Sequence, residues 1–358
     1  MTPRYHSLRV AEVRIETPEC ISLKFDLPPE LAHEYRFVQG QHLGLRTTLD
    51  GEELRRSYSI CSGLDDAEIR VAIKKVGGGK FSQWAHDALK TGDPIDVMTP
   101  EGGFFTPLDA NQARHYAAFV AGSGITPVLS LIRTTLAREP KSRFTLVYGN
   151  RRQSSVMFHE ALEDLKDRHL TRFRLYNVFS REQQDVELFN GRIDAAKVRQ
   201  FLESLLPSDT IDEAFVCGPA NMIDEVEASL IASGVPSQHV HVERFGIPTG
   251  LVQNGAQAID DAEAAQSHVE LIIDGVRRTV EFMPGQHSIL DAGRDSGVDL
   301  PFSCKGGMCS TCRARVLEGQ VKMVKNYALE PHEVAEGFVL TCQSYPLTER
   351  VVISYDAR

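Results

Sequence analysis

The chain has 358 residues, 42% of them hydrophobic and 25% charged, a composition typical of soluble globular proteins. This length favours two or three domains. The net charge of −10 argues against nucleic acid and anionic membranes as partners, and no apolar run is long enough to span a bilayer. Because the N-terminus has no apolar signal region, the expected location is the cytoplasm.

Residues 1–108 carry the pattern of an antiparallel β-barrel. Short alternating segments, such as residues 22–27 and 68–73, are separated by glycine and proline. Such segments with regularly spaced turn residues predict a barrel, interrupted by one helix over residues 81–89.

A polar motif on one predicted strand of this barrel suggests a flavin site. Arg56 and Tyr58 are two residues apart, so they point to the same side of an extended strand. An arginine can pair with a pyrophosphate, a tyrosine can stack on an isoalloxazine ring, and Ser59 can hydrogen-bond the N5 edge of that ring. The same residues would also fit an ordinary surface strand.

A glycine-rich turn leads into the predicted helix of the barrel. Gly79 and Ser82 lie in the segment Gly-Gly-Lys-Phe-Ser. Glycines before a helix N-terminus expose N–H groups that can bind a phosphate. The alternative is a plain turn in which Ser82 caps the helix.

Residues 109–247 change to alternating strands and helices. The predicted strands cover residues 116–120, 143–148 and 214–216, and the predicted helices cover residues 126–138, 159–168 and 220–233. This alternation predicts a parallel α/β sheet.

A second glycine motif lies where the first of these strands leads into its helix. The four candidate residues for a nucleotide phosphate are Gly122, Gly124, Thr126 and Pro127. The glycines allow a phosphate to approach the backbone, and an early proline suits the first turn of the helix. At a strand end in a parallel sheet, this motif favours dinucleotide binding.

Arg151 follows the second strand of the same predicted sheet. A guanidinium at that strand end can bind a 2′-phosphate bidentately, which favours NADPH. If Arg151 is only a solvated surface charge, NADH is the cofactor instead.

Residues 248–267 lose periodic pattern and are rich in Ala, Gln, Asp and Gly. We interpret them as a flexible linker, with a short helix over residues 262–266 as the alternative. The linker separates the α/β block from a last domain, residues 268–358.

The last domain contains four cysteines in the spacing C-x4-C-x2-C-x29-C: Cys304, Cys309, Cys312 and Cys342. This spacing is that of plant-type 2Fe-2S ferredoxins, and thiolates are suitable ligands for iron. A structural zinc site is the alternative, although zinc sites usually contain two close pairs of ligands. The other three cysteines are scattered and odd in number, which argues against a disulfide framework.

Together these motifs resemble the ferredoxin–NADP reductase superfamily. Its R-x-Y-S motif corresponds to Arg56, Tyr58 and Ser59, and its G-x-x-S motif to Gly79 and Ser82. One departure is visible, because the usual P-G-Q turn is Gln-Gly-Gln at residues 39–41.

The resemblance also implies roles for residues that the patterns alone do not assign. Cys217, Gly218 and Pro219 would lie beside the nicotinamide, with Cys217 where hydride passes to the flavin. Glu243 and Phe245 would approach the reactive edge of the flavin, with a purely structural role as the alternative because related reductases differ at this position. Ser59, Cys217 and Glu243 are therefore the expected catalytic residues.

The module order and stretches such as residues 50–56 and 326–331 are similar to the reductase subunits of phenylacetyl-CoA epoxidases. This resemblance implies an NAD(P)H-dependent enzyme with FAD, a β-grasp 2Fe-2S domain and a di-iron oxygenase as partner. Reductases for steroid, fatty-acid and aromatic oxygenases, hydroxylases or desaturases share the architecture. A non-catalytic metal-binding interaction module is the alternative of another class, which the retained Arg56, Tyr58 and Gly122 disfavour.

Overall fold

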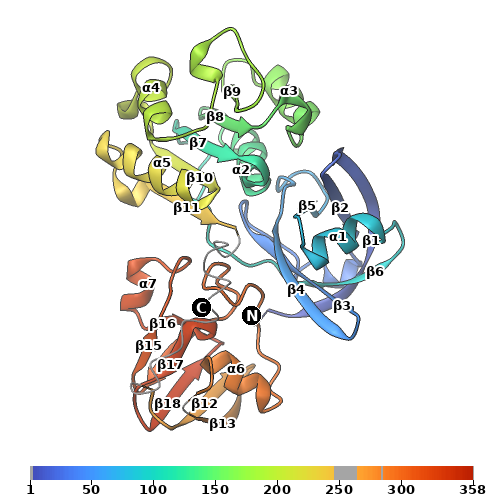
Figure 1. Ribbon diagram of the computed structural model, residues 1–358, viewed down its shortest axis with the longest axis vertical. Coiled ribbons are helices and arrows are strands. Elements are labelled where there is room, and N and C mark those ends of the chain that lie inside the picture. The colour runs from blue at the N-terminus through green and yellow to red at the C-terminus, as the bar shows by residue number, and fades with distance from the viewer. Residues whose placement is uncertain (1–2, 246–263, 284, 358) are drawn as a thin grey trace. The chain divides into compact units, whose positions relative to one another are not determined.

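The computed structural model describes residues 3–245, 264–283 and 285–357 (Figure 1). These residues form two compact units. The larger unit comprises Ser7–Leu43 and Tyr58–Phe245, and the smaller comprises Met1–His6, Gly44–Ser57 and Gly246–Arg358. Most of the predicted linker lies outside the described residues. No helix within the described ranges is long and apolar enough to cross a membrane.

The N-terminal sheet has six strands in the order β4-β3-β6-β1-β2-β5. They are β1 Tyr5–Thr17, β2 Cys20–Asp26, β3 His42–Leu49, β4 Glu52–Ser59, β5 Arg70–Lys74 and β6 Pro94–Met98. Just beyond β4, Ile60 forms an antiparallel bridge with Val71 of β5. This bridge joins the two ends of the strand order, so the predicted barrel is confirmed. Helix α1, Lys80–Asp87, is close to the predicted range.

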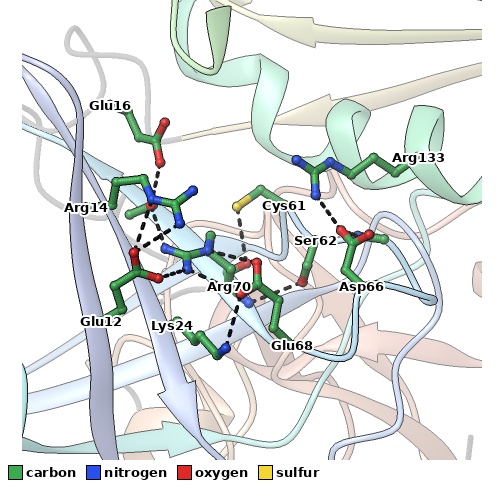
Figure 2. A network of polar contacts seen from close by, with 12 residues as sticks. Glu12, Arg14, Glu16, Lys24, Cys61, Ser62, Asp66, Glu68, Arg70 and Arg133 are labelled. Carbon is green, nitrogen blue, oxygen red and sulfur yellow. Dashed lines mark hydrogen bonds and ion pairs between the residues drawn. The ribbon is translucent and has the colours of Figure 1, made fainter. Parts of the chain in front are cut away.

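A buried arginine supports this barrel (Figure 2). Arg70 of β5 is 4% exposed, and its guanidinium donates to Ser22 at 3.0 Å and to Glu68 at 3.0 Å. It also pairs with Glu12 of β1. Because a buried charge is costly unless it is paired, these contacts hold three strands or loops in one arrangement.

The central sheet is parallel, with the order β11-β10-β7-β8-β9. Its strands are β7 His115–Ala121, β8 Arg143–Asn150, β9 Phe173–Phe179, β10 Glu213–Gly218 and β11 Val240–Arg244. Its helices are α2 Ile125–Arg138, α3 His159–Arg168, α4 Ala195–Ser204 and α5 Ala220–Ala232. The predicted α/β alternation is therefore confirmed, and helix α3 has the predicted bounds.

Two apolar cores cover the two faces of this sheet. Residues of α2 and α3 pack in one core together with Cys20, Cys61 and Ala72 of the barrel. Residues of α4 and α5 form the other core. The loop before β5 is also fastened to α2, because Arg138 pairs with Asp65 at 2.9 Å and the N–H of Leu64 donates to Thr134 at 3.2 Å. The helix that begins at the glycine motif is thus fixed to the barrel.

The C-terminal domain has a five-stranded sheet, β13-β12-β18-β14-β16, and a separate pair, β15-β17. Its strands are β12 Ser267–Ile273, β13 Val276–Phe282, β14 Arg313–Glu318, β15 Val321–Met323, β16 Phe338–Leu340, β17 Ser344–Pro346 and β18 Arg350–Ser354. Its helices are α6 Ile289–Asp295 and α7 Pro331–Ala335. The parallel pairing of β12 with β18 between antiparallel neighbours is the β-grasp arrangement.

Candidate flavin, nucleotide and cluster sites

Strand β4 carries the predicted flavin residues. The ring of Tyr58 lies 5.7 Å from that of Phe81 on α1. The hydroxyl of Ser59 is buried and has no hydrogen-bond partner among the described residues. A buried hydroxyl without a partner costs free energy, so this position suits a group that accepts or donates a hydrogen bond when bound. The geometry therefore fits the flavin contact predicted for Ser59.

Hydrogen bonds between the Ser82 side chain and the backbone hold the turn before α1. The hydroxyl of Ser82 donates to the carbonyl of Gly79 at 3.1 Å and accepts from the N–H of Val76 at 3.1 Å. An added Cβ on Gly79 would lie 2.8 Å from the Ser82 hydroxyl oxygen. Ser82 thus shapes the turn, and the N–H groups that open α1 are the part of the motif suited to a phosphate.

The nucleotide motif forms a tight turn between β7 and α2. Gly122 has a φ of +55°, and Gly122–Gly124 form a short 3-10 turn. The hydroxyl of Thr126 donates to the carbonyl of Ser123 at 3.0 Å, and Thr126 and Pro127 are buried. The first turn of the 14-residue helix α2 therefore opens beside the glycine loop. A helix N-terminus attracts anionic groups such as phosphates.

Two residues near this loop were not predicted from the sequence as site residues. The hydroxyl of Tyr148, on β8, donates to the carbonyl of Gly122 at 3.0 Å. The ammonium of Lys74, on β5, lies 3.6 Å from the position of an added Cβ on Gly122. Lys74 thus places a positive charge against the glycine loop. The two consecutive lysines at residues 74 and 75 are the sequence feature that could have predicted this charge.

The predicted hydride-transfer residues meet at the ends of β10 and β11. Cys217 on β10 is fully buried, and Glu243 is its register partner on β11. Burial raises the pKa of the Cys217 thiol, and the charge of Glu243 raises it further. Cys217 is therefore a neutral thiol and not a nucleophilic thiolate.

The remaining predicted residues of this region lie at or just beyond the carboxyl ends of β8, β10 and β11. An added Cβ on Gly218 would lie 2.9 Å from the terminal methyl carbon of Met222, and Pro219 precedes helix α5. Phe245, just beyond β11, is 39% exposed. The side chain of Arg151 is 60% exposed and has Glu19 at 4.0 Å. Arg151 is thus accessible at its strand end, as a residue that contacts a nucleotide must be.

The four cysteines of the last domain converge as two pairs. The N–H of Cys304 donates to the sulfur of Cys309 at 3.4 Å, and the thiols of Cys312 and Cys342 interact with each other. Within the described part of the chain, no three His, Cys, Asp or Glu side chains are grouped for a single ion. Two pairs of thiolates suit a cluster of two irons, in which each iron takes two cysteines.

Backbone N–H groups surround the first pair. The sulfur of Cys304 accepts from the N–H of Gly306 at 3.3 Å and of Met308 at 3.4 Å. Hydrogen bonding with the Cys309 thiol, assisted by these N–H groups, lowers the pKa of Cys304 to about 6. Gly307 has a φ of +77°, a conformation that glycine favours. The loop is therefore arranged to stabilise negative charge on sulfur.

The larger unit also contains a cleft of about 680 Å³ between the barrel and the helices α2 and α3. Its lining includes Arg70, Arg133 and Asp66 and none of the predicted cofactor residues. The arginines of this lining already pair with carboxylates, as Arg133 does with Asp66, so they give no indication of an anionic ligand.

Comparison with protein families assigns all three parts of the chain. Residues 7–105 match the oxidoreductase FAD-binding domain, and residues 119–228 match the oxidoreductase NAD-binding domain. Residues 271–347 match the 2Fe-2S iron-sulfur cluster binding domain. The chain is therefore an NAD(P)H-dependent flavin iron-sulfur oxidoreductase, and the zinc alternative is excluded.

Comparison with individual similar proteins places the chain more narrowly within this class of oxidoreductases. The chain is 45% identical over 354 residues to one of the subunits of 1,2-phenylacetyl-CoA epoxidase from Escherichia coli, covering 99% of this chain and 98% of the relative. It is 32% identical to the ferredoxin reductase component of 3-ketosteroid-9-alpha-monooxygenase from Rhodococcus rhodochrous, covering 97% and 96%. The chain belongs to this family of oxygenase reductase components.

A solved structure agrees on the fold. Phthalate dioxygenase reductase matches 98% of this chain and 98% of its own, with a TM-score of 0.59 and 23% identity. The predicted fold class is confirmed by this structure and by the domain matches, and the domain matches confirm the predicted enzyme class and cofactors (FAD, NAD(P)H and a 2Fe-2S cluster).

Proposed function

We propose that the chain transfers electrons from NADPH through FAD and the 2Fe-2S cluster to a di-iron oxygenase component that epoxidises phenylacetyl-CoA. The observation that carries this proposal is the 45% identity to a phenylacetyl-CoA epoxidase component over nearly the whole chain. The domain set supports the order of transfer, because FAD, when bound, accepts a hydride and releases electrons singly.

The residues of the larger unit would bind and orient the two-electron donor. The N–H groups at Gly122, Gly124 and the start of α2 would hold nucleotide phosphate, with Lys74 adding a positive charge. Cys217 and Glu243 would orient the nicotinamide, since they lie next to each other at the ends of β10 and β11. Arg151 would bind the 2′-phosphate of NADPH.

The flavin would be held by the barrel. On strand β4, Arg56 would pair with its pyrophosphate, Tyr58 would stack on its ring, and Ser59 would donate to its N5 edge. Gly79 and Ser82 would shape the second phosphate turn, and Phe245 would cover the ring. The buried hydroxyl of Ser59 supports this arrangement because it lacks another partner among the described residues.

The four cysteines would bind the cluster as the pairs Cys304–Cys309 and Cys312–Cys342. We propose the domain limits 1–108 for flavin, 109–247 for nucleotide, 248–267 for a linker and 268–358 for the cluster. The family matches at residues 7–105, 119–228 and 271–347 support this division. Three buried cysteines form no disulfide within the described residues: Cys20, Cys61 and Cys217. Buried free thiols of this kind support a reducing, cytoplasmic location.

Reconstitution tests the proposed acceptor. The purified chain is mixed with the oxygenase component of a phenylacetyl-CoA epoxidase, NADPH and phenylacetyl-CoA, and epoxide formation is compared with NADPH consumption. We expect coupled turnover that depends on the reductase. A parallel reaction uses a 3-ketosteroid oxygenase, because the 32% identity to its reductase makes it the second candidate. Coupling only to the steroid oxygenase would overturn the epoxidase assignment.

A further inference from the structure

Arg55 is a buried arginine that the flavin motif leaves without a role. Its neighbour Arg56 is exposed, whereas Arg55 is 6% exposed. Its Nε donates to Glu53 at 2.9 Å, and its Nη2 lies 3.5 Å from Asp299. A charge buried to this degree is tolerated only when partners compensate for its lost hydration. One of these partners comes from the cluster domain.

The same guanidinium contacts the segment that leads into the first cluster ligand. Its carbon lies 4.2 Å from the ring centre of Phe302, a cation–π contact. Two residues farther along β4, the hydroxyl of Ser57 donates to that of Ser303 at 2.9 Å. Phe302 and Ser303 directly precede Cys304. Strand β4 therefore holds the backbone from which the first sulfur projects.

Alternation along β4 divides its side chains between two cofactors. Residues 55 and 57 share one side of the strand, and residues 56 and 58 share the other. The first pair contacts the cluster segment, and the second pair is our proposed flavin contact.

Tyr5, the first residue of β1, brings a hydroxyl to the same region. Its ring lies 4.2 Å from the guanidinium carbon of Arg46 and 5.2 Å from that of Arg55. Arg4 pairs with Asp274 at 3.4 Å, which fixes this end of the chain on the cluster domain. The Tyr5 hydroxyl is buried and has no hydrogen-bond partner among the described residues.

Tyr5 lies beside the cluster segment, because its ring and that of Phe302 both lie against the guanidinium of Arg55. Burial raises the pKa of Tyr5 to about 12, although the two nearby arginines oppose this. The phenol therefore keeps its proton and remains a donor. A buried donor without an acceptor is unfavourable, because it loses its hydrogen bond to water and gains none in return. Sulfurs of a bound cluster are acceptors of the kind that this hydroxyl lacks.

We propose that Tyr5 donates a hydrogen bond to a sulfur of the bound cluster, and that Arg55 and Ser57 position the Phe302–Ser303 segment, and with it the first cluster ligand, for reduction of the cluster. This inference rests on the proposed function, in which the cluster accepts electrons from the flavin. The step moves one electron from reduced flavin to oxidised cluster, with no bond made or broken. A hydrogen bond to sulfur stabilises the reduced cluster, whose charge is more negative, and so raises its reduction potential.

The role of Tyr5 is tested on the purified holoenzyme without any oxygenase. The cluster potential is measured by redox titration of its EPR signal in Tyr5→Phe and in Tyr327→Phe, which changes an exposed tyrosine of the cluster domain. We expect a more negative potential for Tyr5→Phe and the wild-type potential for Tyr327→Phe. Equal potentials in Tyr5→Phe and the wild type would overturn the proposed hydrogen bond.

The role of Arg55 is tested by anaerobic rapid mixing with NADPH. In Arg55→Ala we expect flavin reduction at the wild-type rate and cluster reduction slowed by roughly tenfold or more, as when reacting groups are misplaced. Arg9→Ala, an exposed arginine on β1, is the control. Arg55→Lys should restore the rate only in part, because lysine lacks the planar fork. Cluster reduction at the wild-type rate in Arg55→Ala would refute the positioning role.

A structural readout completes the test. Ser57→Cys combined with Ser303→Cys should form a disulfide, detected by non-reducing mass mapping, because the two hydroxyls are 2.9 Å apart. The control pair is Ser57→Cys with Ser296→Cys, at the end of α6. Failure of the first pair to cross-link would overturn the contact. Failure of the oxygenase reconstitution alone would overturn the acceptor and leave this inference standing.

Discussion

Gly124 lies so close to Cys217 that an added Cβ would be 2.2 Å from the Cys217 carbonyl oxygen. A contact this short is with backbone, which cannot rotate away. The absent side chain therefore allows the glycine loop after β7 to lie against the end of β10. The phosphate motif and the predicted hydride-transfer residue are joined through this one position.

We expect Gly124→Ala to separate these two strand ends. The overpacking should cost about 1–3 kcal/mol of unfolding free energy and raise the KM for NADPH. Steady-state ferricyanide reduction and thermal unfolding measure the two effects. Gly103→Ala is the matched control, since an added Cβ there meets nothing within 4 Å. If both variants have the stability and the KM of the wild type, the close approach of Gly124 to Cys217 is not needed for either property.

Replacement of one cluster ligand should separate the two halves of the electron path. In Cys309→Ser we expect loss of the cluster EPR signal and of electron transfer to the oxygenase. NADPH-dependent ferricyanide reduction should persist, because the nucleotide and flavin motifs are built from other segments. Ser310→Ala keeps all four sulfurs and serves as the control. Full oxygenase activity in a cluster-free Cys309→Ser protein would contradict the scheme.

Arg151 determines the choice of nicotinamide in our proposal. Removing a charge-assisted hydrogen bond costs about 1.5–3 kcal/mol, so Arg151→Ala should lower kcat/KM for NADPH by roughly tenfold or more. NADH lacks the 2′-phosphate, and its kcat/KM should change little. Arg152→Ala, also exposed, is the comparison. Equal losses for both nucleotides would place the 2′-phosphate contact elsewhere.

Much of this architecture could be predicted because its patterns are local. Helix α3 has the predicted bounds of residues 159–168, since an amphipathic repeat between two buried strands leaves few alternatives. The cysteine spacing likewise specifies its cofactor within about forty residues of sequence. The glycine motifs were recognisable because they follow strands and open helices.

The contacts that could not be predicted join segments far apart in sequence. Ser57 and Ser303 are 246 residues apart, and no periodicity pairs them. Arg55 carried no signal of burial, because it adjoins an exposed Arg56 in a charged stretch. Lys74 acquires its position from the way β5 packs beside the glycine loop. Such residues depend on tertiary packing, which a single sequence does not record.

The buried pairing of Arg70 should contribute strongly to the stability of the barrel. Arg70→Met leaves Glu68 and Glu12 without their cation and should lower the unfolding free energy by about 3 kcal/mol. Arg14→Ala removes a side chain that is 57% exposed and should cost less than about 0.5 kcal/mol. Thermal unfolding at neutral pH compares the stabilities of the two variants. Similar losses of unfolding free energy in both would contradict the proposed contribution of the Arg70 contacts.

The buried imidazole of His115 should make the stability of the protein depend on pH. This side chain, at the start of β7, lies between Thr145 and Thr210, with its Nε2 2.8 Å from the Thr145 hydroxyl and its Nδ1 3.0 Å from the Thr210 carbonyl. Burial, aided by the nearby Arg143, lowers the pKa of His115 to about 4. The folded state therefore holds a neutral imidazole where the unfolded chain would be protonated below about pH 6.5.

The sign of the effect follows from proton binding. Between about pH 6.5 and 4 the unfolded state binds more protons than the folded state at this residue, so stability falls as the pH falls, by at most about 1.4 kcal/mol per pH unit. Replacing His115 by Gln, which cannot be protonated, should flatten this dependence while lowering stability at pH 7. Unfolding free energies at pH 7, 6 and 5 measure both changes. His33→Gln, at an exposed histidine, should keep the wild-type slope. An unchanged slope in His115→Gln would show that other groups cause the acid sensitivity.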